Sequence, residues 1–243
     1  MINCKTAHLL SFLLALALCW TLVLPGSVRA SGIEITEPTE TAEATDPTYN
    51  TLKKGTILTF GTYPQDGEAD PLEWVVMDCE EGVATLTTRY AIASAPYNSR
   101  KAEVTWEDSE IRQWLNSDFY DTAFSEEDKA LILESYLHNR DNPQYPVDGG
   151  ESTFDYVYLM SYDEVMSGFS SNRSRTLRPT THAKDQNIDL SQKDETCWWF
   201  LRTPGDSQKA VMYVNSDGSV VNSGTQVNAK KGGIRPTIHI LVP

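Results

Sequence analysis

The sequence predicts an α+β fold in which antiparallel sheets carry two or three short helices on one side, and three observations support this class. Apolar and polar residues alternate with a period of two near both ends of the chain, as in 56–60 and 234–242. Turn signals at 80–82 and 215–218 separate neighbouring strand-like segments and indicate hairpins. Apolar residues recur at helical spacing between 105 and 133, so the main helices follow one another along the chain.

Composition and charge narrow the range of partners. The chain has 243 residues, of which 40% are hydrophobic and 10% aromatic, which is typical of a single folded domain with appendages. Its formal net charge is -14. Phosphate binding needs clustered Lys and Arg, so the charge argues against nucleic acid and against an anionic membrane surface as partners. We expect an extracellular glycan or protein as the ligand, and no cofactor.

Residues 1–30 have the features of a secretory signal peptide. Lys5 supplies a positive start, residues 9–24 form an apolar run, and small residues around Ala30 suit cleavage. A membrane span would need about 20 consecutive apolar residues, and this run is shorter. We therefore predict a secreted or extracytoplasmic protein, at the cell envelope or outside it, with no membrane contact beyond the signal peptide.

Residues 31–50 are predicted to be a linker. They contain five acidic residues, no basic residue, several threonines and two prolines. This composition is typical of an extended segment whose like charges repel one another. The single globular domain is therefore expected to span residues 51–243.

The first part of the domain is predicted to be β-structure. A strand at 56–60 ends where Gly61 interrupts the alternation. The apolar-rich segments 72–77 and 83–88 are joined by a short turn, which predicts an antiparallel hairpin.

Two helices are predicted next. Thr105 and Asp108 have the spacing of a capping box, and the apolar residues of 111–115 follow at helical spacing. A second helix is expected to begin at Ser125, where acidic residues favour a helix N-terminus, and to continue through Leu133.

The middle of the domain alternates between regular and irregular segments. Residues 155–160 have strand character, and 161–168 are predicted to be a helix with a capping box at its start and Gly168 at its end. Residues 139–152 and 169–196 are long, polar and aperiodic. Long irregular connections in a compact domain are often functional, so these two segments are candidate recognition loops.

The last part is again predicted to be β-structure. Segments 211–214 and 219–222 flank an Asp-Gly turn, which predicts a hairpin. The final strand spans 234–242, and Pro236 is expected at a strand start, a bulge or an edge because it lacks a backbone donor.

The two cysteines that follow the predicted signal peptide are Cys79 and Cys197. An exported protein meets oxidising conditions, so a bridge between them is one hypothesis. Closing so long a loop would contribute about 4–5 kcal/mol in the chain-entropy model. Two buried free thiols are the other hypothesis, since sequence separation says nothing about the distance between the two Cα atoms.

Several segments of the chain resemble a family of uncharacterised bacterial exported domains, domain of unknown function 6273. The matching segments occur in the family's order and cover essentially all of 51–243; they are 60–65, 73–76, 97–98, 105–116, 123–125, 155–161, 199–205 and 234–236. The sequence departs from the family mildly: Phe200 stands where a second Trp is common, Thr203 where Ser is common, and Glu151 where Asn is frequent.

A looser similarity concerns the end of the chain. The aromatic-Leu-Arg segment at 199–202, the hairpin after it and the Gly-Ile-Arg-Pro segment at 233–236 are similar to the end of C-type-lectin-like domains, including the formylglycine-generating-enzyme branch. This resemblance implies a C-type-lectin-like architecture. It implies no activity, because one fold supports many functions.

The candidate ligand-binding residues are Trp198, Arg202 and Arg235. Trp198 and Trp199 are neighbours, so in a strand they face opposite ways and one ring is free to stack against a sugar or peptide. Both arginines lie in segments that match the family. A structural role, stacked on an aromatic ring or paired with a carboxylate, is the favoured interpretation of both arginines, and ligand contact is the alternative.

The candidate metal ligands are Asp148, Glu151 and Asp155. Calcium accepts carboxylates from flexible loops, and these acids are close in sequence, although no EF-hand spacing is present. Ordinary solvated loop acids are the favoured alternative. His138, His182 and His239 are scattered, so the sequence does not favour zinc.

No catalytic motif is evident. The sequence contains no Gly-x-Ser-x-Gly elbow and no His-Glu-x-x-His pattern. A glycosidase needs only two suitably spaced carboxylates, and too many acids are present to choose a pair. We therefore expect a non-catalytic binding module that recognises carbohydrate or another cell-surface ligand; the alternatives are an envelope-associated hydrolytic enzyme and a structural domain for protein–protein contact.

Overall fold

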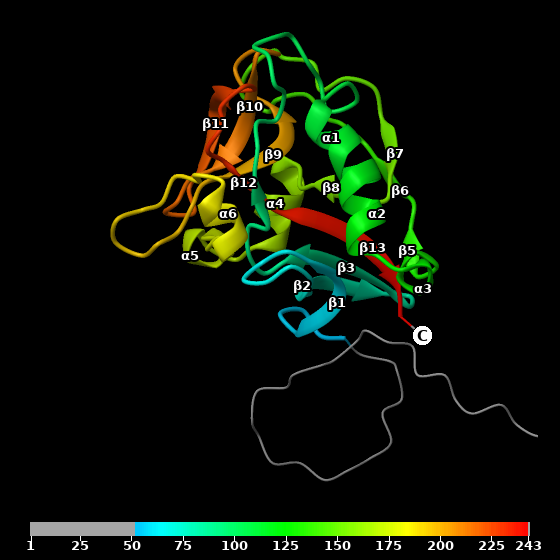
Figure 1. Ribbon diagram of the computed structural model, residues 1–243. Helices are drawn as coiled ribbons and strands as arrows, with labels where there is room; N and C mark the ends of the chain where they lie inside the picture. Colours follow the sequence, from blue (N-terminus) through cyan, green and yellow to red (C-terminus); the bar gives the residue numbers. More distant parts are fainter. Residues whose placement is uncertain (1–51, 243) are drawn as a thin grey trace, which may run out of the picture.

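The computed structural model describes residues 52–242 and has the predicted α+β class, with mostly antiparallel sheets and short helices (Figure 1). The predicted signal peptide at 1–30 and the predicted linker at 31–50 lie outside the described residues.

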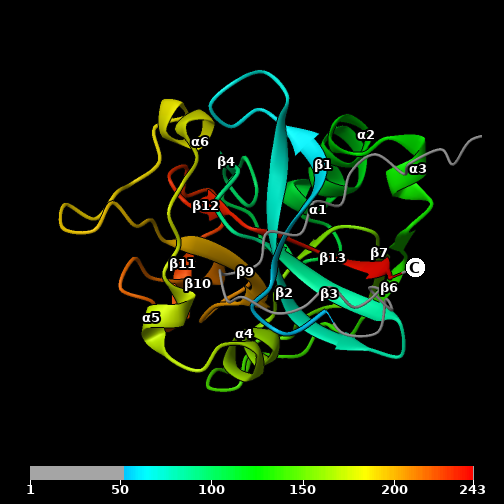
Figure 2. The ribbon, with the colours of Figure 1, turned by 90° about the horizontal axis from the view of Figure 1, so that it is seen from below.

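The larger sheet joins the two ends of the domain. Its strands run in the order β1-β2-β3-β13-β5, and β8 also pairs with β13; every pair is antiparallel. The C-terminal strand β13 therefore lies beside β3 (Figure 2). The bounds are β1 Ile57–Tyr63, β2 Asp70–Glu80, β3 Val83–Thr88, β5 Ile132–Leu133, β8 Tyr158–Leu159 and β13 Pro236–Leu241.

The alternation seen in the sequence sets one face of this sheet. Leu58 and Phe60 of β1 and Trp74 and Val76 of β2 are buried on the same core. The sequence predicted that this strand ends at Gly61, and that prediction is wrong. The strand passes through a bulge and continues to Tyr63, because Gly61 has a φ of +68° and a Cβ there would lie 2.6 Å from the carbonyl oxygen of Ala123.

A second sheet has the order β11-β10-β9-β12-β4. The predicted hairpin is confirmed as β10 and β11, while the predicted final strand divides into β12 in this sheet and β13 in the larger one. Pro236 begins β13, as its missing donor requires. The bounds are β4 Ala93–Ser94, β9 Trp199–Pro204, β10 Ala210–Val214, β11 Val220–Gln226 and β12 Gly233–Ile234.

The first helical region begins later than predicted. Ser109, not Thr105, is the N-cap, and its side chain accepts from the backbone N–H of Arg112. Three short segments follow directly on one another: α1 Glu110–Trp114, the π-helix η1 Leu115–Phe119 and α2 Tyr120–Ala123. Thr105 does not cap a helix; its side chain packs against Gly150 in the segment 139–152.

The other helices confirm two of the predicted caps. Ser125 and Asp128 form a capping box for α3 Glu126–Lys129, and Ser161 and Glu164 form one for α4 Tyr162–Gly168. The predicted continuation of the second helix through Leu133 is wrong, since that residue lies on β5. Segment 169–196 is also less irregular than expected, because it contains α5 Asn172–Arg175 and α6 Thr181–Asp185.

The helices pack in more than one place, which corrects the prediction that they lie on one side of a sheet. The α1–α2 region packs on the larger sheet at β1, α6 contacts β4, and α4 contacts β9 (Figure 1). The buried apolar side chains accordingly form two clusters: a first core that includes Trp74, Trp106 and Phe119, and a second core that includes Met77, Cys197 and Trp199.

Candidate functional site

The candidate site is centred on an ion pair between Arg202 of β9 and Glu164 of α4. The Nη1 and Nη2 atoms of Arg202 donate to the two carboxylate oxygens of Glu164, the second over 3.1 Å. The guanidinium also donates from Nε to Asn139 Oδ1 and from Nη1 to the Leu159 carbonyl. Such a two-point pair fixes both position and orientation.

The two side chains of this ion pair are buried to different extents. The Arg202 side chain is 4% exposed, because all residues of β9 are buried, whereas the Glu164 side chain is 36% exposed. Burial raises the pKa of Glu164, but the charge and hydrogen bonds of Arg202, together with hydrogen bonds from Ser161, outweigh this effect and hold the pKa below its ordinary value. Glu164 is therefore a carboxylate at neutral pH.

A chain of polar contacts continues behind Arg202. Its guanidinium carbon lies 5.4 Å from the centre of the Tyr158 ring. The Tyr158 hydroxyl is 3.1 Å from His239 Nε2, and Ser135 Oγ is 2.8 Å from His239 Nδ1. Burial lowers the pKa of His239 and raises that of Tyr158, so both groups are neutral at pH 7.

A groove opens in front of the ion pair. It has a volume of about 780 Å³, and its walls are residues 136–143, Gly150, residues 161–164, Arg202 and Thr203. Segment 139–152, predicted to be a recognition loop, supplies one wall, and the first turn of α4 supplies the other.

The loop wall is held by buried polar contacts. The Nδ2 of Asn142 contacts the carbonyls of Pro204, Gly205 and Asn222 at 2.9 Å, and its Oδ1 accepts from the backbone of Gln144. Asn142 is 6% exposed. This one amide therefore ties the loop to the end of β9 and to β11, and so fixes this wall of the groove.

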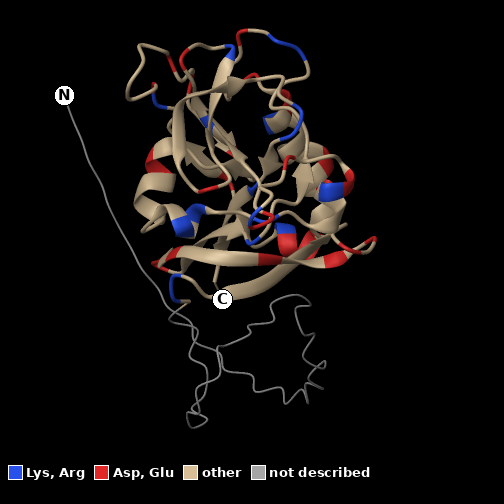
Figure 3. Ribbon diagram, turned by 90° about the vertical axis from the view of Figure 1, so that its left-hand side faces the viewer, with Lys and Arg blue, Asp and Glu red and all other residues tan. Residues whose placement is uncertain are grey.

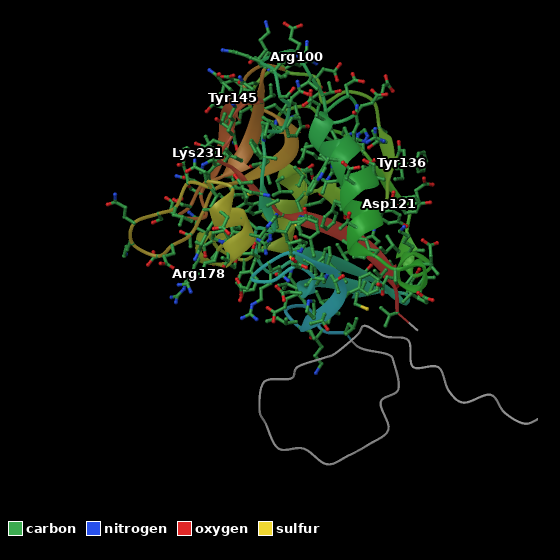
Figure 4. All side chains as sticks on the ribbon, in the orientation of Figure 1. Arg100, Asp121, Tyr136, Tyr145, Arg178 and Lys231 are labelled. Carbon is green, nitrogen blue, oxygen red and sulfur yellow. The ribbon has the colours of Figure 1, made fainter. Side chains whose placement is uncertain are left out.

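Two exposed aromatic rings lie side by side, one of them bordering the groove, and neither was predicted as a site residue. Tyr136 of β6 (Ser135–Leu137) and Phe154 of β7 (Thr153–Asp155) are direct cross-strand partners with ring centres 5.2 Å apart. Their exposed fractions are 62% and 59%, and Tyr136 lines the groove. Figure 4 shows Tyr136 at the outer surface beside β7. No sequence signal marks them, because in Thr153-Phe154-Asp155 it is the flanking polar residues that are buried and the aromatic residue that faces outward.

Trp198, a candidate ligand-binding residue, lies outside the groove. Its ring is half-buried and packs edge-on against Phe200 and Tyr213, with centroid distances of 4.9 and 5.3 Å. A Cβ at Gly232 would lie 2.4 Å from the same ring. Trp198 does not line the groove, whereas its neighbour Trp199 is fully buried in the second core.

Arg235 has a structural environment. It is 4% exposed, and its guanidinium lies 5.0 Å from the centre of the Phe169 ring and 5.1 Å from that of Trp199. Its Nε donates to the Thr88 carbonyl, while Nη1 has no hydrogen-bond partner among the described residues. Burial lowers the pKa of Arg235 to about 10. Stacking between two rings stabilises this buried cation.

The predicted calcium ligands are not brought together. Asp155 is buried and accepts from Arg112 and from Trp106 Nε1, while Asp148 accepts from the backbone of Gly150 and Glu151 is exposed. Within residues 52–242, no group of three or more His, Cys, Asp or Glu side chains is arranged to hold a metal ion. Asp155 instead forms an ion pair with Arg112.

Both cysteines are free thiols in the structure, Cys79 partly exposed and Cys197 buried. Cys79 packs against the first core and Cys197 lies in the second, so the two side chains belong to different clusters and the bridge is absent. Burial raises the pKa of Cys197 to about 12, which makes its thiol a poor nucleophile.

The surface carries mixed charge. Basic and acidic ribbon segments are interspersed on the face shown in Figure 3. Among the described residues, no helix has the length and apolar character needed to cross a membrane.

Comparison with known proteins identifies the family. A family model described as Domain of unknown function (DUF6273) matches residues 81–242, which is more than half of the chain. No curated protein and no solved structure matches the chain, so the similarity to C-type-lectin-like domains gains no support from these comparisons. The match includes the strands and helices that build the ion pair and the groove. The chain belongs to the DUF6273 family.

Proposed function

We propose that this protein is an exported, non-catalytic binding module that recognises carbohydrate or another surface polymer in the groove beside Arg202 and Glu164. The observation that carries this proposal is the outward-facing aromatic pair, Tyr136 and Phe154, of which Tyr136 borders a groove of about 780 Å³. The ligand would be a polymer met outside the cytoplasm, at the cell envelope.

The chemistry of the groove suits a sugar. A pyranose ring has an apolar C–H face, which stacks on exposed aromatic rings, and hydroxyl groups, which need donors and acceptors nearby. The groove offers Tyr136 for the first contact. Arg140 and Asp163, which form an exposed ion pair at 3.4 Å, supply donors and acceptors for the second.

The state of Glu164 does not suit the role of general acid in hydrolysis. A general acid in a glycosidase has a pKa raised toward neutrality, so that it can give up its proton to the leaving group. Arg202 has the opposite effect on Glu164, whose pKa is lowered. The rigid pair therefore suits a fixed wall that accepts hydrogen bonds from a ligand.

A C-type-lectin-like architecture is part of this proposal. Its support is the order of the last elements: an aromatic-Leu-Arg segment on β9, the β10–β11 hairpin, and an Arg-Pro segment that passes between the two sheets at β12 and β13. In this arrangement, segment 139–152 and β9 both border the ligand groove.

The test is an array of glycans and cell-wall fragments probed with the purified protein, its Tyr136→Ala and Phe154→Ala variants, and a Tyr90→Ala control. Tyr90 is a partly exposed aromatic residue that does not line the groove. We expect saturable binding that falls at least about tenfold, or roughly 1.4 kcal/mol, when either edge ring is removed. Binding that is equal in all four proteins, or turnover of a glycoside without retention, would show that the proposal is wrong; capture by a protein ligand alone would favour the protein–protein alternative.

A further inference from the structure

A second concave site lies on the other side of Glu164, between α4 and the larger sheet. This pocket has a volume of about 350 Å³. Its floor is formed by β3 and β13, on which Thr85 and His239 are direct cross-strand partners. Its opposite wall is the second half of α4, where Gly168 allows close approach: a Cβ at that position would lie 2.9 Å from the terminal methyl of Met77.

The neutral groups of the pocket are already satisfied. The two ring nitrogens of His239 contact Ser135 Oγ and Tyr158 OH, and burial keeps both His239 and Tyr158 uncharged at neutral pH. The carboxylate of Glu164 is neutralised by Arg202. None of these groups adds net charge to the pocket.

The remaining charges are of opposite sign and come from different elements. Lys54 lies in the turn before β1, which is anchored by a backbone hydrogen bond from Gly55 to Val76, and Asp78 lies on β2. Neither side chain forms an ion pair with another described residue. The Oδ1 of Asp78 accepts a hydrogen bond from the backbone N–H of Cys79, and its other carboxylate oxygen has no hydrogen-bond partner among the described residues. A pocket bordered by a cation and an anion that are not paired with described residues suits a ligand that carries both charges itself.

The apolar part of the lining is adaptable. Met77 and Met160 are both buried and both border the pocket. Thioether side chains adjust to irregular aliphatic groups. The hydroxyl of Thr85, which is half-buried on the pocket floor, makes no hydrogen bond to a described residue and is available as a donor.

We propose that this pocket binds a small zwitterion of the free amino-acid class, with its carboxylate at Lys54, its ammonium at Asp78 and Glu164, and an aliphatic or thioether side chain at Met77 and Met160. Ligand binding here does not depend on the carbohydrate proposal, because only Glu164 borders both sites. Each carboxylate oxygen of Glu164 has more than one lone pair, so an ammonium can bind without displacing Arg202.

The test uses the full chain with ¹³C-labelled methionine methyl groups. L-Methionine, L-norvaline and glycine are the probes, and N-acetyl-methionine and methionine amide, each lacking one of the two charges, are the comparison ligands. We expect saturable shifts of the Met77 and Met160 methyl signals with the first two zwitterions and weaker ones with glycine. The signal of Met166, which is 44% exposed and does not line the pocket, should not move.

Matched variants identify the charges. Lys54→Gln and Asp78→Asn should each weaken binding about tenfold, which corresponds to roughly 1.4 kcal/mol. Lys53→Gln, a change at the neighbouring exposed lysine that does not line the pocket, should leave binding unchanged. The proposal is overturned if millimolar zwitterion leaves both methyl signals in place, if the N-acetyl or amide forms bind equally well, or if Lys54→Gln and Asp78→Asn bind as the unmodified protein does.

Discussion

Arg202 and Glu164 stand 38 residues apart in the chain and meet through two hydrogen bonds, with the guanidinium almost fully buried and the carboxylate partly in water. The pair lies between the groove and the second pocket, because Glu164 borders both. It therefore connects α4 to β9 and at the same time forms a wall of each site.

Replacing Arg202 should destabilise the protein strongly. Arg202→Ala removes bonds to Glu164, Asn139 and the Leu159 carbonyl, and leaves their acceptors without a donor. Breaking a buried ion pair costs about 3–5 kcal/mol, and the lower end applies because Glu164 keeps contact with water. Urea denaturation measures the free energy of unfolding. Arg140→Ala is the matched control, since the Arg140–Asp163 pair is exposed and should contribute less than about 1 kcal/mol.

Acid should destabilise the protein in two separate ranges. The pKa of His239 in the folded state is lowered from its ordinary value of 6.5. The neutral, buried imidazole therefore contributes fully to the free energy of unfolding above pH 6.5, and this contribution is lost as the pH falls through the folded-state pKa. The pKa of Glu164 is lowered from 4.5, so its contribution is lost only at more acidic pH. We expect His239→Gln to flatten the dependence of stability on pH just below 6.5, and Glu164→Gln to flatten it below 4.5.

Chemical denaturation at a series of pH values tests this assignment. His182→Gln is the control, because His182 is another histidine outside the Ser135–His239–Tyr158 contacts. An unchanged slope in His239→Gln between pH 6.5 and the acid limb would contradict the assignment of the upper range to that residue.

Much of the fold could be predicted because its signals are local. The caps at Ser125 and Ser161 and the Asp-Gly turn of the β10–β11 hairpin act within four residues, and all three were recognised correctly. The first helix start was misplaced at Thr105 because two suitable cap residues occur close together, and the burial of Ser109 beneath Trp106 decides between them.

The site could not be predicted because its contacts are distant in sequence. Arg202 was a candidate ligand-binding residue for which a structural role was favoured, but nothing in the sequence shows that its partners are Glu164 and Asn139. Tyr136 and Phe154 were not predicted as exposed rings for a related reason. An aromatic residue in a strand of three residues is equally consistent with a core position, and only the pairing of Tyr136 with Phe154 turns both outward.

Replacing Arg235, which is stacked between two rings, with methionine should lower the stability of the protein less than replacing it with alanine. Arg235→Met keeps much of the contact with Phe169 and Trp199 and removes a buried charge that no described carboxylate pairs, whereas Arg235→Ala leaves a cavity. We expect Arg235→Ala to cost about 3–5 kcal/mol and Arg235→Met clearly less. Thermal and urea unfolding of both variants give the comparison. Equal losses would mean that the charge, rather than the stacking volume, stabilises the site.

The two thiols provide a direct test of the packing of the two cores. Because Cys79 and Cys197 lie in different clusters, the oxidised and reduced proteins should have the same intact mass after alkylation in denaturant, with both residues labelled without reductant. In the native state, the reaction of Cys197 should be much slower than that of Cys79, since Cys197 is fully buried and its pKa is raised to about 12, while Cys79 is partly exposed. In protein that lacks residues 1–30, and with them Cys4 and Cys19, Cys79→Ser leaves a single thiol and shows the rate of Cys197 alone. A denatured protein that takes up label only after reduction would instead establish a disulfide and contradict the two free thiols of this structure.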